Sequence, residues 1–365
     1  MDERKPEKRI RIWVMTHKPV TVSLPSVYVP LQVGKALHED LGYTGDDTGD
    51  NISALNIYYG ELTGQYWVAK QKMDTDYTGL CHYRRYFLNQ ENHIMEGSEY
   101  LDLLQHHDVI LPRAISFPKS YYEVYQESHN IHDLDAVGDA IRTMNPQLYE
   151  VFSEVVNGHE VHSSNMFVAS SELFREYTDW LFSVFEMAKE NINPEAYDTY
   201  HRRVYGFLSE QLNFVWIRWK GLGICEVPCG ITQEKAETLE VKEMLKREIA
   251  RGGAQCGIRA LELFRAQIEK RPDIMLPASD LSGEMEDLFR VIYILAREQE
   301  NKRENCMLWL SSRLDDLLCH YRLIRTIRKK MQSGTATQEE VQYYRDAKVS
   351  SDMEEQIDQM GAQIG

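Results

Sequence analysis

Short apolar runs, each bounded by polar residues, recur through the first two thirds of the chain and predict buried β-strands. These runs lie at residues 11–15, 77–81, 109–111 and 226–228, and a further one ends the segment 161–169, where polar residues lead into it. Residues 27–34 also follow an extended pattern, but Pro30 has no amide proton to donate to a neighbouring strand. We therefore expect that segment to lie outside the centre of a sheet.

Between the strands, apolar residues at steps of three and four predict amphipathic helices. The clearest pattern covers residues 53–72, where one face carries Leu55, Tyr58, Tyr59, Leu62, Tyr66 and Ala69. Asn51 and Ser53 stand at its start as candidate N-caps. Further helical patterns lie at 133–144, 148–156, 171–190 and 202–219. Strands that alternate with helices predict an α/β fold, with a mixed sheet flanked by helices.

After about residue 231 the strand patterns stop. Residues 234–251, 256–271 and 282–331 follow helical patterns, which predict an all-α extension at 233–335. Leu310, Leu317 and Ile324 lie seven residues apart there, with Leu314 and Tyr321 between them. This pattern suits a helical hairpin or the seam of an oligomer. We expect a disordered leader at 1–9 and a polar tail, helical or disordered, at 336–365.

Composition narrows the class of protein. The 365-residue chain carries a formal charge of −16, which argues against nucleic acid as a partner because phosphate backbones require a basic surface. The one close cysteine pair, Cys225 and Cys229, completes no zinc-binding spacing, so we expect reduced thiols. No apolar run approaches the roughly 20 residues of a transmembrane segment. We expect a cytoplasmic protein, with peripheral association at the inner face of the membrane left open.

The predicted strand end with the most functional side chains is His82-Tyr83-Arg84-Arg85, which follows the apolar run at 77–81. Ligands of open α/β sheets bind beyond the carboxyl ends of the strands. Arg84 and Arg85 would present guanidinium N–H donors there, and that donor geometry suits a phosphate group. Structural ion pairs with some of the 57 carboxylates of the chain explain the two arginines equally well.

Two more polar segments follow predicted strands or precede a helix. Thr16 and His17 end the first strand, where polar residues can touch a base or phosphate, although an ordinary turn before Pro19 is the simpler interpretation. The loop at 45–53 holds two glycines and three aspartates, Asp46, Asp47 and Asp50. It fits a cation site, a site for ribose or sugar hydroxyls, or capping with solvated charge, which we favour for Asp46.

Six blocks of sequence occur along residues 9–231: I-W-V-M-T-H-K, G-D-D-T-G-D-N-I-S, Y-Y-G-E-L-T-G-Q-Y-W-V-A-K, D-Y-T-G-L-C-H-Y-R-R-Y-F, S-N-M-F-V and R-V-Y-G-F-L-S-E-Q-L-N. In this order they resemble a bacterial family of capsular and exopolysaccharide glycosyltransferases, long labelled a domain of unknown function, some of whose members look like galactofuranosyltransferases. The resemblance implies a GT-A-like domain at 10–232, a Rossmann-type sheet that holds a nucleoside-diphosphate sugar, usually a UDP-sugar. The C-terminal third lies outside it.

Glycosyl transfer requires stabilisation of the departing diphosphate and removal of a proton from the acceptor hydroxyl. We predict that His82, Arg84 and Arg85 stabilise the diphosphate and do so without a metal ion. We assign the nucleoside to Thr16, His17, Asp50 and Asn51, and the donor sugar to Asn165, although an asparagine that enters a strand is often only turn chemistry. Glu210 is the candidate general base, which implies inversion at the anomeric carbon, although a solvated or helix-dipole carboxylate also explains it.

Asp74-Thr75-Asp76 matches the D-x-D spelling with which many nucleotide-sugar transferases hold a divalent metal. It precedes its strand instead of following it, so we interpret it as a turn. The prediction requires no cofactor. Where Mn²⁺ or Mg²⁺ takes part, the carboxylates available to it are Asp46, Asp47, Asp74 and Asp76.

The predicted function is transfer of a hexosyl unit, with galactofuranosyl among the options, from a UDP-sugar to a growing surface polysaccharide. The acceptor is a glycan or a lipid-linked glycan. One alternative is a transferase that moves a pyranose from UDP-glucose or UDP-galactose with retention. The other is a non-catalytic, transferase-like scaffold in a polysaccharide-assembly complex, docked through the C-terminal helices, which the misplaced D-x-D spelling favours. An oligomer formed through those helices is part of the same prediction.

Overall fold

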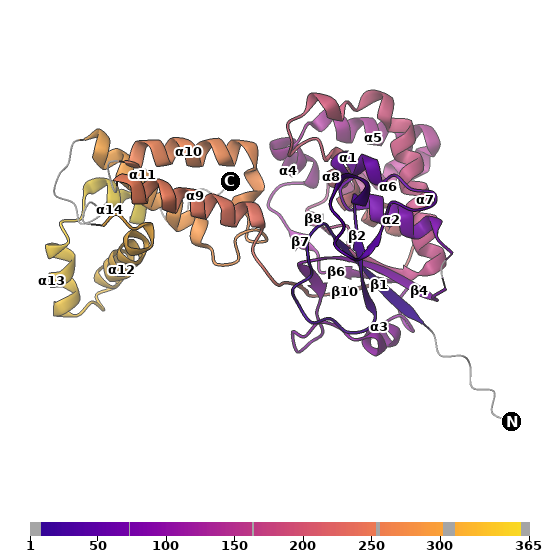
Figure 1. The fold of residues 1–365 in the computed structure, drawn as a ribbon, viewed down its shortest axis with the longest axis horizontal. Helices are drawn as coiled ribbons and strands as arrows, with labels where there is room; N and C mark the ends of the chain where they lie inside the picture. The colour runs from indigo at the N-terminus through magenta and orange to yellow at the C-terminus, as the bar shows by residue number, and fades with distance from the viewer. Residues whose placement is uncertain (1–8, 73, 163, 253–255, 302–310, 359–365) are drawn as a thin grey trace. The chain divides into compact units, whose positions relative to one another are not determined.

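The computed structural model of the chain describes residues 9–72, 74–162, 164–252, 256–301 and 311–358 (Figure 1). Contacts divide the chain into two compact units, Met1–Thr232 and Gln233–Gly365. The first unit contains the sheet and the second contains only helices among its described residues. The predicted mixed sheet flanked by helices, followed by an all-α extension, is confirmed.

The first unit is built around a mixed sheet (Figure 1). Across it, the described strands follow the order β10 (Ile224–Val227), β6 (Val109–Pro112), β9 (Phe167–Ser170), β4 (Tyr77–His82), β1 (Ile10–Thr16), β2 (Tyr28–Gln32) and β3 (Thr44–Gly45). β1 runs parallel to β2 and β4, and β9 runs antiparallel to β4 and β6. Short strands β5 (Arg85–Phe87) and β11 (Cys229–Ile231) pair beside β4, while β7 (Ile115–Ser116) pairs with β8 (Glu160–Val161) separately.

Apolar cores lie on both faces of this sheet. Successive side chains of a strand point to opposite faces, and in β1 Ile12 and Val14 join one core while Trp13 and Met15 join the other. The helices of this unit are α1 (Asn56–Tyr59), α2 (Leu62–Lys70), α3 (Gly97–Leu103), α4 (Tyr121–Ser128), α5 (Ile131–Met144), α6 (Pro146–Val156), α7 (Ser171–Ala188) and α8 (Val204–Lys220). The larger core lies beneath α2, α5, α6, α7 and α8.

The helix predicted over residues 53–72 is broken in the structure. A 3-10 turn (Ser53–Leu55) leads into α1, and α2 begins only at Leu62. Gly60, between them, has a φ of +54°, a left-handed conformation that a residue with a side chain rarely adopts. Ile52 occupies the cap position of the 3-10 turn and the Ser53 hydroxyl donates to Asp46, whereas the Asn51 side-chain oxygen accepts from the Ser53 backbone N–H, the first amide of the turn.

The strand that contains Pro30 is not central, as expected, but it has a partner strand on each side. β2 lies between β1 and β3, and Pro30 is opposite Val14 of β1. On the other side, β3 pairs only with Leu31 and Gln32. Pro30 therefore has no partner on β3 that needs an amide proton, and the strand is locally an edge at that residue.

The second unit contains α9 (Ala236–Gly252), α10 (Gly257–Lys270), α11 (Glu284–Glu300), α12 (Leu314–Gln332), α13 (Gln338–Asp346) and α14 (Ser351–Asp358). The heptad stripe on α12 is buried in the core of this unit, with Leu314, Leu317, Tyr321 and Ile324 each at most 1% exposed. These residues contact other helices of the same unit and are not available as an oligomer seam. Leu310, residues 1–8 of the leader and 359–365 of the tail lie outside the described residues.

Among the described residues, none of the helices combines the length and the apolar character needed to cross a bilayer.

Candidate active site

The carboxyl ends of four parallel strands lie along one edge of the sheet. β4, β1, β2 and β3 are neighbours in that order and run in the same direction. The segments that follow them are His82–Arg85 after β4, Thr16–His17 after β1 and the loop at 46–51 after β3. The structure therefore brings the predicted diphosphate and nucleoside residues to the same edge, where open α/β sheets bind ligands.

After β4 the chain folds back on itself. His82 pairs with Arg85 across the antiparallel turn between β4 and β5, so that Arg84 lies in the turn and Arg85 begins the next strand. The His17 ring packs edge-on against Tyr83, with 5.1 Å between the ring centroids. This contact joins the end of β1 to the end of β4.

A left-handed segment before β9 completes the site. Ser164 and Asn165 have φ values of +90° and +50°, an uncommon conformation for residues other than glycine. β9 is the antiparallel neighbour of β4, so this segment lies beside the strand end. The His82 Nε2 atom donates to the Ser164 carbonyl oxygen at 2.5 Å. That bond places the ring proton on Nε2 and leaves Nδ1 as an acceptor.

Asn165 ties three elements together. Its amide nitrogen donates to Glu61 Oε1 at 2.8 Å and to the Gly206 carbonyl at 3.0 Å, and its amide oxygen accepts from the Ser209 hydroxyl at 2.8 Å. Glu61 precedes α2, while Gly206 and Ser209 belong to the first turns of α8. Asn165 thus acts inside the protein as a cross-link between helices, and its contact with a donor sugar stays a prediction.

Glu210 lies in α8 beside this cross-link. Burial raises the pKa of its carboxyl from the usual value to about 7, and the charge of Glu61 adds to that effect. Three interactions oppose this rise in the pKa: the charge of Arg85, a hydrogen bond that the Ser164 backbone N–H donates, and the charge of Arg203. A carboxyl with a pKa near neutrality can both accept and release a proton at physiological pH, which is the property a general base needs.

His82 has the opposite shift. Burial lowers the pKa of its imidazole, and the positive charges of Arg85 and Arg84 lower it further, against the influence of Glu61 and the bond to Ser164. The ring is therefore neutral at pH 7. It orients the site through its N–H group and carries no charge toward a phosphate.

The two arginines differ in burial. Arg84 is 7% exposed, whereas Arg85 is half-buried. The charge of Arg85 lowers the pKa values of His82, Glu210 and Cys229. Its side chain makes no hydrogen bond or salt bridge to the residues that the structure describes, so its donors are available to a ligand.

The loop at 45–53 corrects one expectation. Asp46 is fully buried, and its carboxylate accepts hydrogen bonds from the backbone of Gly34 and Lys35 and from the Ser53 hydroxyl. The solvated role favoured for it is therefore wrong, because these donors replace water and fix the loop to the segment after β2.

The remaining donor-site residues are exposed or turned inward. Asp47 and Asp50 are exposed, and Asp50 accepts from the Tyr66 hydroxyl at 3.1 Å. Asn51 Oδ1 accepts from the Ser53 backbone. The Thr16 hydroxyl is buried and donates to the Lys18 carbonyl. Thr16 therefore shapes the turn, and the exposed His17 is the residue there that can reach a ligand.

The D-x-D spelling lies at the opposite edge of the sheet. Asp74 and Asp76 precede β4; Asp74 forms a 3.1 Å salt bridge with Arg11, and Asp76 accepts from the Arg9 backbone. Within the described part of the chain, no group of three or more histidine, cysteine, aspartate or glutamate side chains is arranged to hold a metal ion.

Sequence reasoning missed Glu61, Ser164, Ser209 and Arg203. Glu61 is the most consequential of these, because its charge acts on both His82 and Glu210. The signal that could have found it is Gly60, since a glycine within a helical pattern can mark the end of a helix. Ser164 acts through its backbone, which no residue pattern reveals.

Residues 11–221 match a family model described as "Domain of unknown function (DUF4422)". No curated protein matches the chain. Among solved structures, the apo form of the bifunctional glycosyltransferase WbbM is similar, with a TM-score of 0.57 and 27% sequence identity. The similarity covers 62% of this chain and 46% of that one, so the chain spans about half the length of the protein it matches.

Proposed function

The chain belongs to the family described as a domain of unknown function (DUF4422), and on that premise we propose that it is a glycosyltransferase. It transfers a hexosyl unit, with galactofuranosyl as the first unit to test, from a UDP-sugar to the hydroxyl of a surface-polysaccharide acceptor. The similarity to WbbM supports the reaction class, and the side chains at the carboxyl edge of the sheet support the assignment of roles.

The observation that carries the proposal is the environment of Glu210. Its carboxyl has a pKa of about 7 and lies within the influence of the Arg85 guanidinium. A base for the acceptor hydroxyl and a cation for the departing phosphate are the two groups that glycosyl transfer requires of a protein. Their combination in one site, at a sheet edge that suits a nucleotide, is difficult to explain as packing alone.

The reaction that we propose is a single displacement. The acceptor oxygen attacks the anomeric carbon, and its proton passes to the Glu210 carboxylate. The bond between the anomeric carbon and the diphosphate oxygen breaks, and its electron pair leaves with UDP. Arg85 and Arg84 stabilise the added negative charge on the diphosphate. One displacement at the anomeric carbon inverts its configuration.

The order of the strands suggests how the donor lies. The diphosphate is placed at the end of β4, where Arg84 and Arg85 follow His82. The nucleoside then extends along the edge past His17 toward Asp50 and Asn51, since β1, β2 and β3 follow β4 in that order. His82 and Asn165 act as positioning residues that hold Ser164 and Glu61 around the reacting groups.

The test is UDP release from UDP-galactofuranose, UDP-galactose and UDP-glucose, with and without oligosaccharide acceptors, in the presence and absence of Mn²⁺. We expect turnover with at least one donor and a loss of about 10²- to 10⁴-fold in Glu210→Gln. Glu91→Gln, a change at a side chain that is 80% exposed, is the matched control. Full activity in Glu210→Gln, or a product of retained configuration by NMR, would contradict the single displacement.

A separate binding measurement distinguishes an inactive scaffold from an enzyme that lacks its correct acceptor. UDP raises the melting temperature of a protein that binds it in the folded state. We expect that increase in the parent protein and in Glu210→Gln, since Glu210 acts on the acceptor. No increase in either protein would contradict the donor site.

A further inference from the structure

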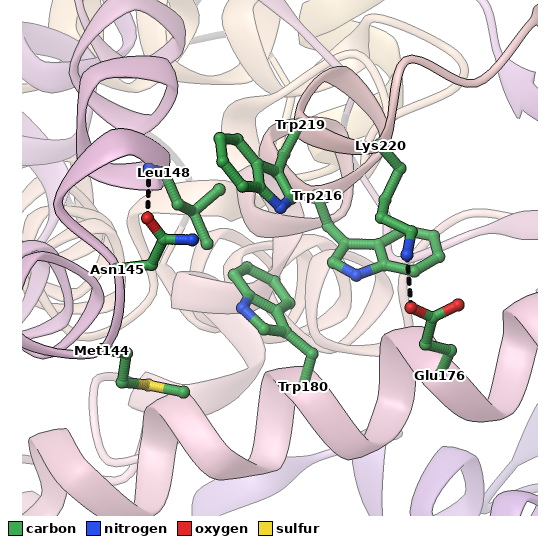
Figure 2. A pocket seen from close by; sticks show the side chains of 8 residues that line it. All are labelled: Met144, Asn145, Leu148, Glu176, Trp180, Trp216, Trp219 and Lys220. Carbon is green, nitrogen blue, oxygen red and sulfur yellow. Dashed lines mark hydrogen bonds and ion pairs between the residues drawn. The ribbon is translucent and has the colours of Figure 1, made fainter.

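A hollow lies on the helical layer of the first unit, away from the residues of the candidate active site. It has a volume of about 220 Å³, and Figure 2 shows the side chains that surround it: Met144, Asn145, Leu148, Glu176, Trp180, Trp216, Trp219 and Lys220. These residues come from the end of α5, the start of α6, the middle of α7 and the last turns of α8. Nothing in the proposed transfer reaction uses them.

The hollow is separate from the site at the sheet edge. Trp219 follows Glu210 by nine residues on α8. In an α-helix that spacing corresponds to roughly 13 Å along the axis and about half a turn around it. Trp219 and Glu210 therefore face opposite sides of α8, and a ligand bound beside Trp219 would leave Glu210 accessible.

Three tryptophans line the hollow with large aromatic rings. Trp216 is buried, Trp180 is half-buried and Trp219 is 36% exposed. None of their indole N–H groups makes a hydrogen bond to the residues that the structure describes, and the indole nitrogens of Trp180 and Trp216 are not among the buried atoms that lack a partner, so these donors face solvent and are open to a ligand. A cluster of large aromatic rings around an open space, with donors unused, is typical of a binding site and not of a packed core.

An oriented amide adds a fourth donor. The Asn145 oxygen accepts from the Gln147 and Leu148 backbone at 3.0 and 3.2 Å, as the cap of α6. These bonds fix the amide plane, and Figure 2 shows its nitrogen on the side of the hollow. That nitrogen makes no hydrogen bond within the described part of the chain, so the amide offers N–H donors to an acceptor atom held there.

The charged residues of the hollow neutralise each other. Lys220 Nζ lies 2.5 Å from Glu176 Oε1 and 5.8 Å from the centre of the Trp216 ring. Because the two charges are paired, the site has no net charge with which to select an ion. It favours a neutral ligand that has flat apolar faces and many oxygen atoms.

We propose that this hollow, the tryptophan pocket, binds one ring of a neutral carbohydrate chain. A pyranose presents an apolar C–H face that can lie on an indole, and its hydroxyl oxygens can accept from the indole and amide N–H groups. The volume suits a group smaller than the ligands that fill pockets of about 300–1,000 Å³. The proposal rests on the pocket residues themselves and adds a second carbohydrate site to the proposed function.

The test is saturation-transfer-difference NMR on the full chain with galactotetraose and cellotetraose as probes and with saturating UDP to occupy the donor site. We expect binding of at least one probe, and shifts of indole N–H resonances upon its addition. Trp219→Ala should weaken binding about fivefold, since one lost stacking partner is worth about 1 kcal/mol. Trp219→Phe should retain most of it, because the ring face remains.

Two matched controls locate the binding. Met187→Ala, on α7 and 44% exposed, removes a comparable apolar side chain outside the pocket and should leave binding unchanged. Glu210→Gln should do the same. Unchanged binding in Trp219→Ala, loss in Glu210→Gln or no indole shift would each overturn the proposal. So would a dimer that Trp219→Ala dissociates, because the pocket would then be an interface between copies of the chain.

Discussion

The side-chain amide of Asn165 donates a 2.8 Å hydrogen bond to the carboxylate of Glu61, across 104 residues of sequence. The bond holds a carboxylate at the start of α2 against the left-handed segment that precedes β9. The charge of Glu61 in turn raises the pKa of Glu210. One buried amide therefore links the packing of the fold to the protonation of the proposed base.

The first prediction concerns this amide. Asn165→Ala should lower the free energy of unfolding by about 1–2 kcal/mol, because the buried bonds of the amide to the Gly206 carbonyl and the Ser209 hydroxyl are lost while those two groups keep the bond to each other. Urea unfolding measures the change. Asn157→Ala, which removes an exposed amide bonded to the Ser153 carbonyl, should change the same quantity by less than about 0.5 kcal/mol. Equal effects of the two substitutions would contradict the cross-link.

The second prediction is a pH profile. A general base must be deprotonated, so kcat/KM should rise with pH through an apparent pKa near the value of about 7 that burial produces at Glu210. Measurement of initial rates from pH 5 to pH 9 gives this midpoint. The step should be absent from the residual activity of Glu210→Gln, and a step that persists there would assign the titration to another group.

The same shift predicts a dependence of stability on pH. The pKa of Glu210 is higher in the folded protein than its usual 4.5, so the folded state binds the proton more tightly than the unfolded state. The stability that this proton contributes is present below about pH 4.5 and is lost as pH rises through about 7. Glu210→Gln should therefore gain in stability relative to the parent protein as pH increases across that interval, by urea unfolding at each pH.

The third prediction concerns the effect of Arg85 on turnover and on the pKa of Glu210. Arg85→Ala should reduce turnover by about 10²- to 10³-fold, since a donor to the departing diphosphate is lost. Arg85 also lowers the pKa of Glu210, so the midpoint of the pH profile should move above that of the parent protein. Arg113→Ala, at an exposed position, serves as the control. An unmoved midpoint would show that Arg85 lies too far from Glu210 to act on it.

The fourth prediction is a shift of the pH midpoint in the opposite direction. Glu61→Gln removes a negative charge that raises the pKa of Glu210, and it retains an amide oxygen that can accept from Asn165. The pH midpoint should therefore move below that of the parent protein, while the free energy of unfolding changes little. A midpoint that moves upward would contradict the assigned electrostatic coupling.

The fifth prediction compares two neighbouring aspartates. Asp46→Ala should destabilise the protein by about 2–3 kcal/mol, because the Gly34 and Lys35 amides and the Ser53 hydroxyl are left without their buried acceptor. Asp47→Ala, one residue later and exposed, should change stability by less than about 0.5 kcal/mol. Thermal or urea unfolding distinguishes the two, and similar losses would show that burial does not separate their roles.

The sequence alone was sufficient where local pattern and structure coincide. The apolar run at 109–111 became β6 (Val109–Pro112), and the helical pattern at 202–219 became α8 (Val204–Lys220). His82 was correctly placed at a strand end, because the change from apolar to polar residues is visible within a few positions. Periodicity reports which face of an element is buried, and that information is contained in neighbouring residues.

Tertiary structure decided what depends on distant partners. Pro30 fits inside the sheet because β3 is too short to reach it, and Asp46 is buried because donors from another loop surround it. Glu61 entered the site only because Gly60 breaks a helix and Asn165 captures the carboxylate. A residue pattern determines what each segment can form, whereas the pKa of Glu210 arises from charges and burial contributed by elements far apart in the chain.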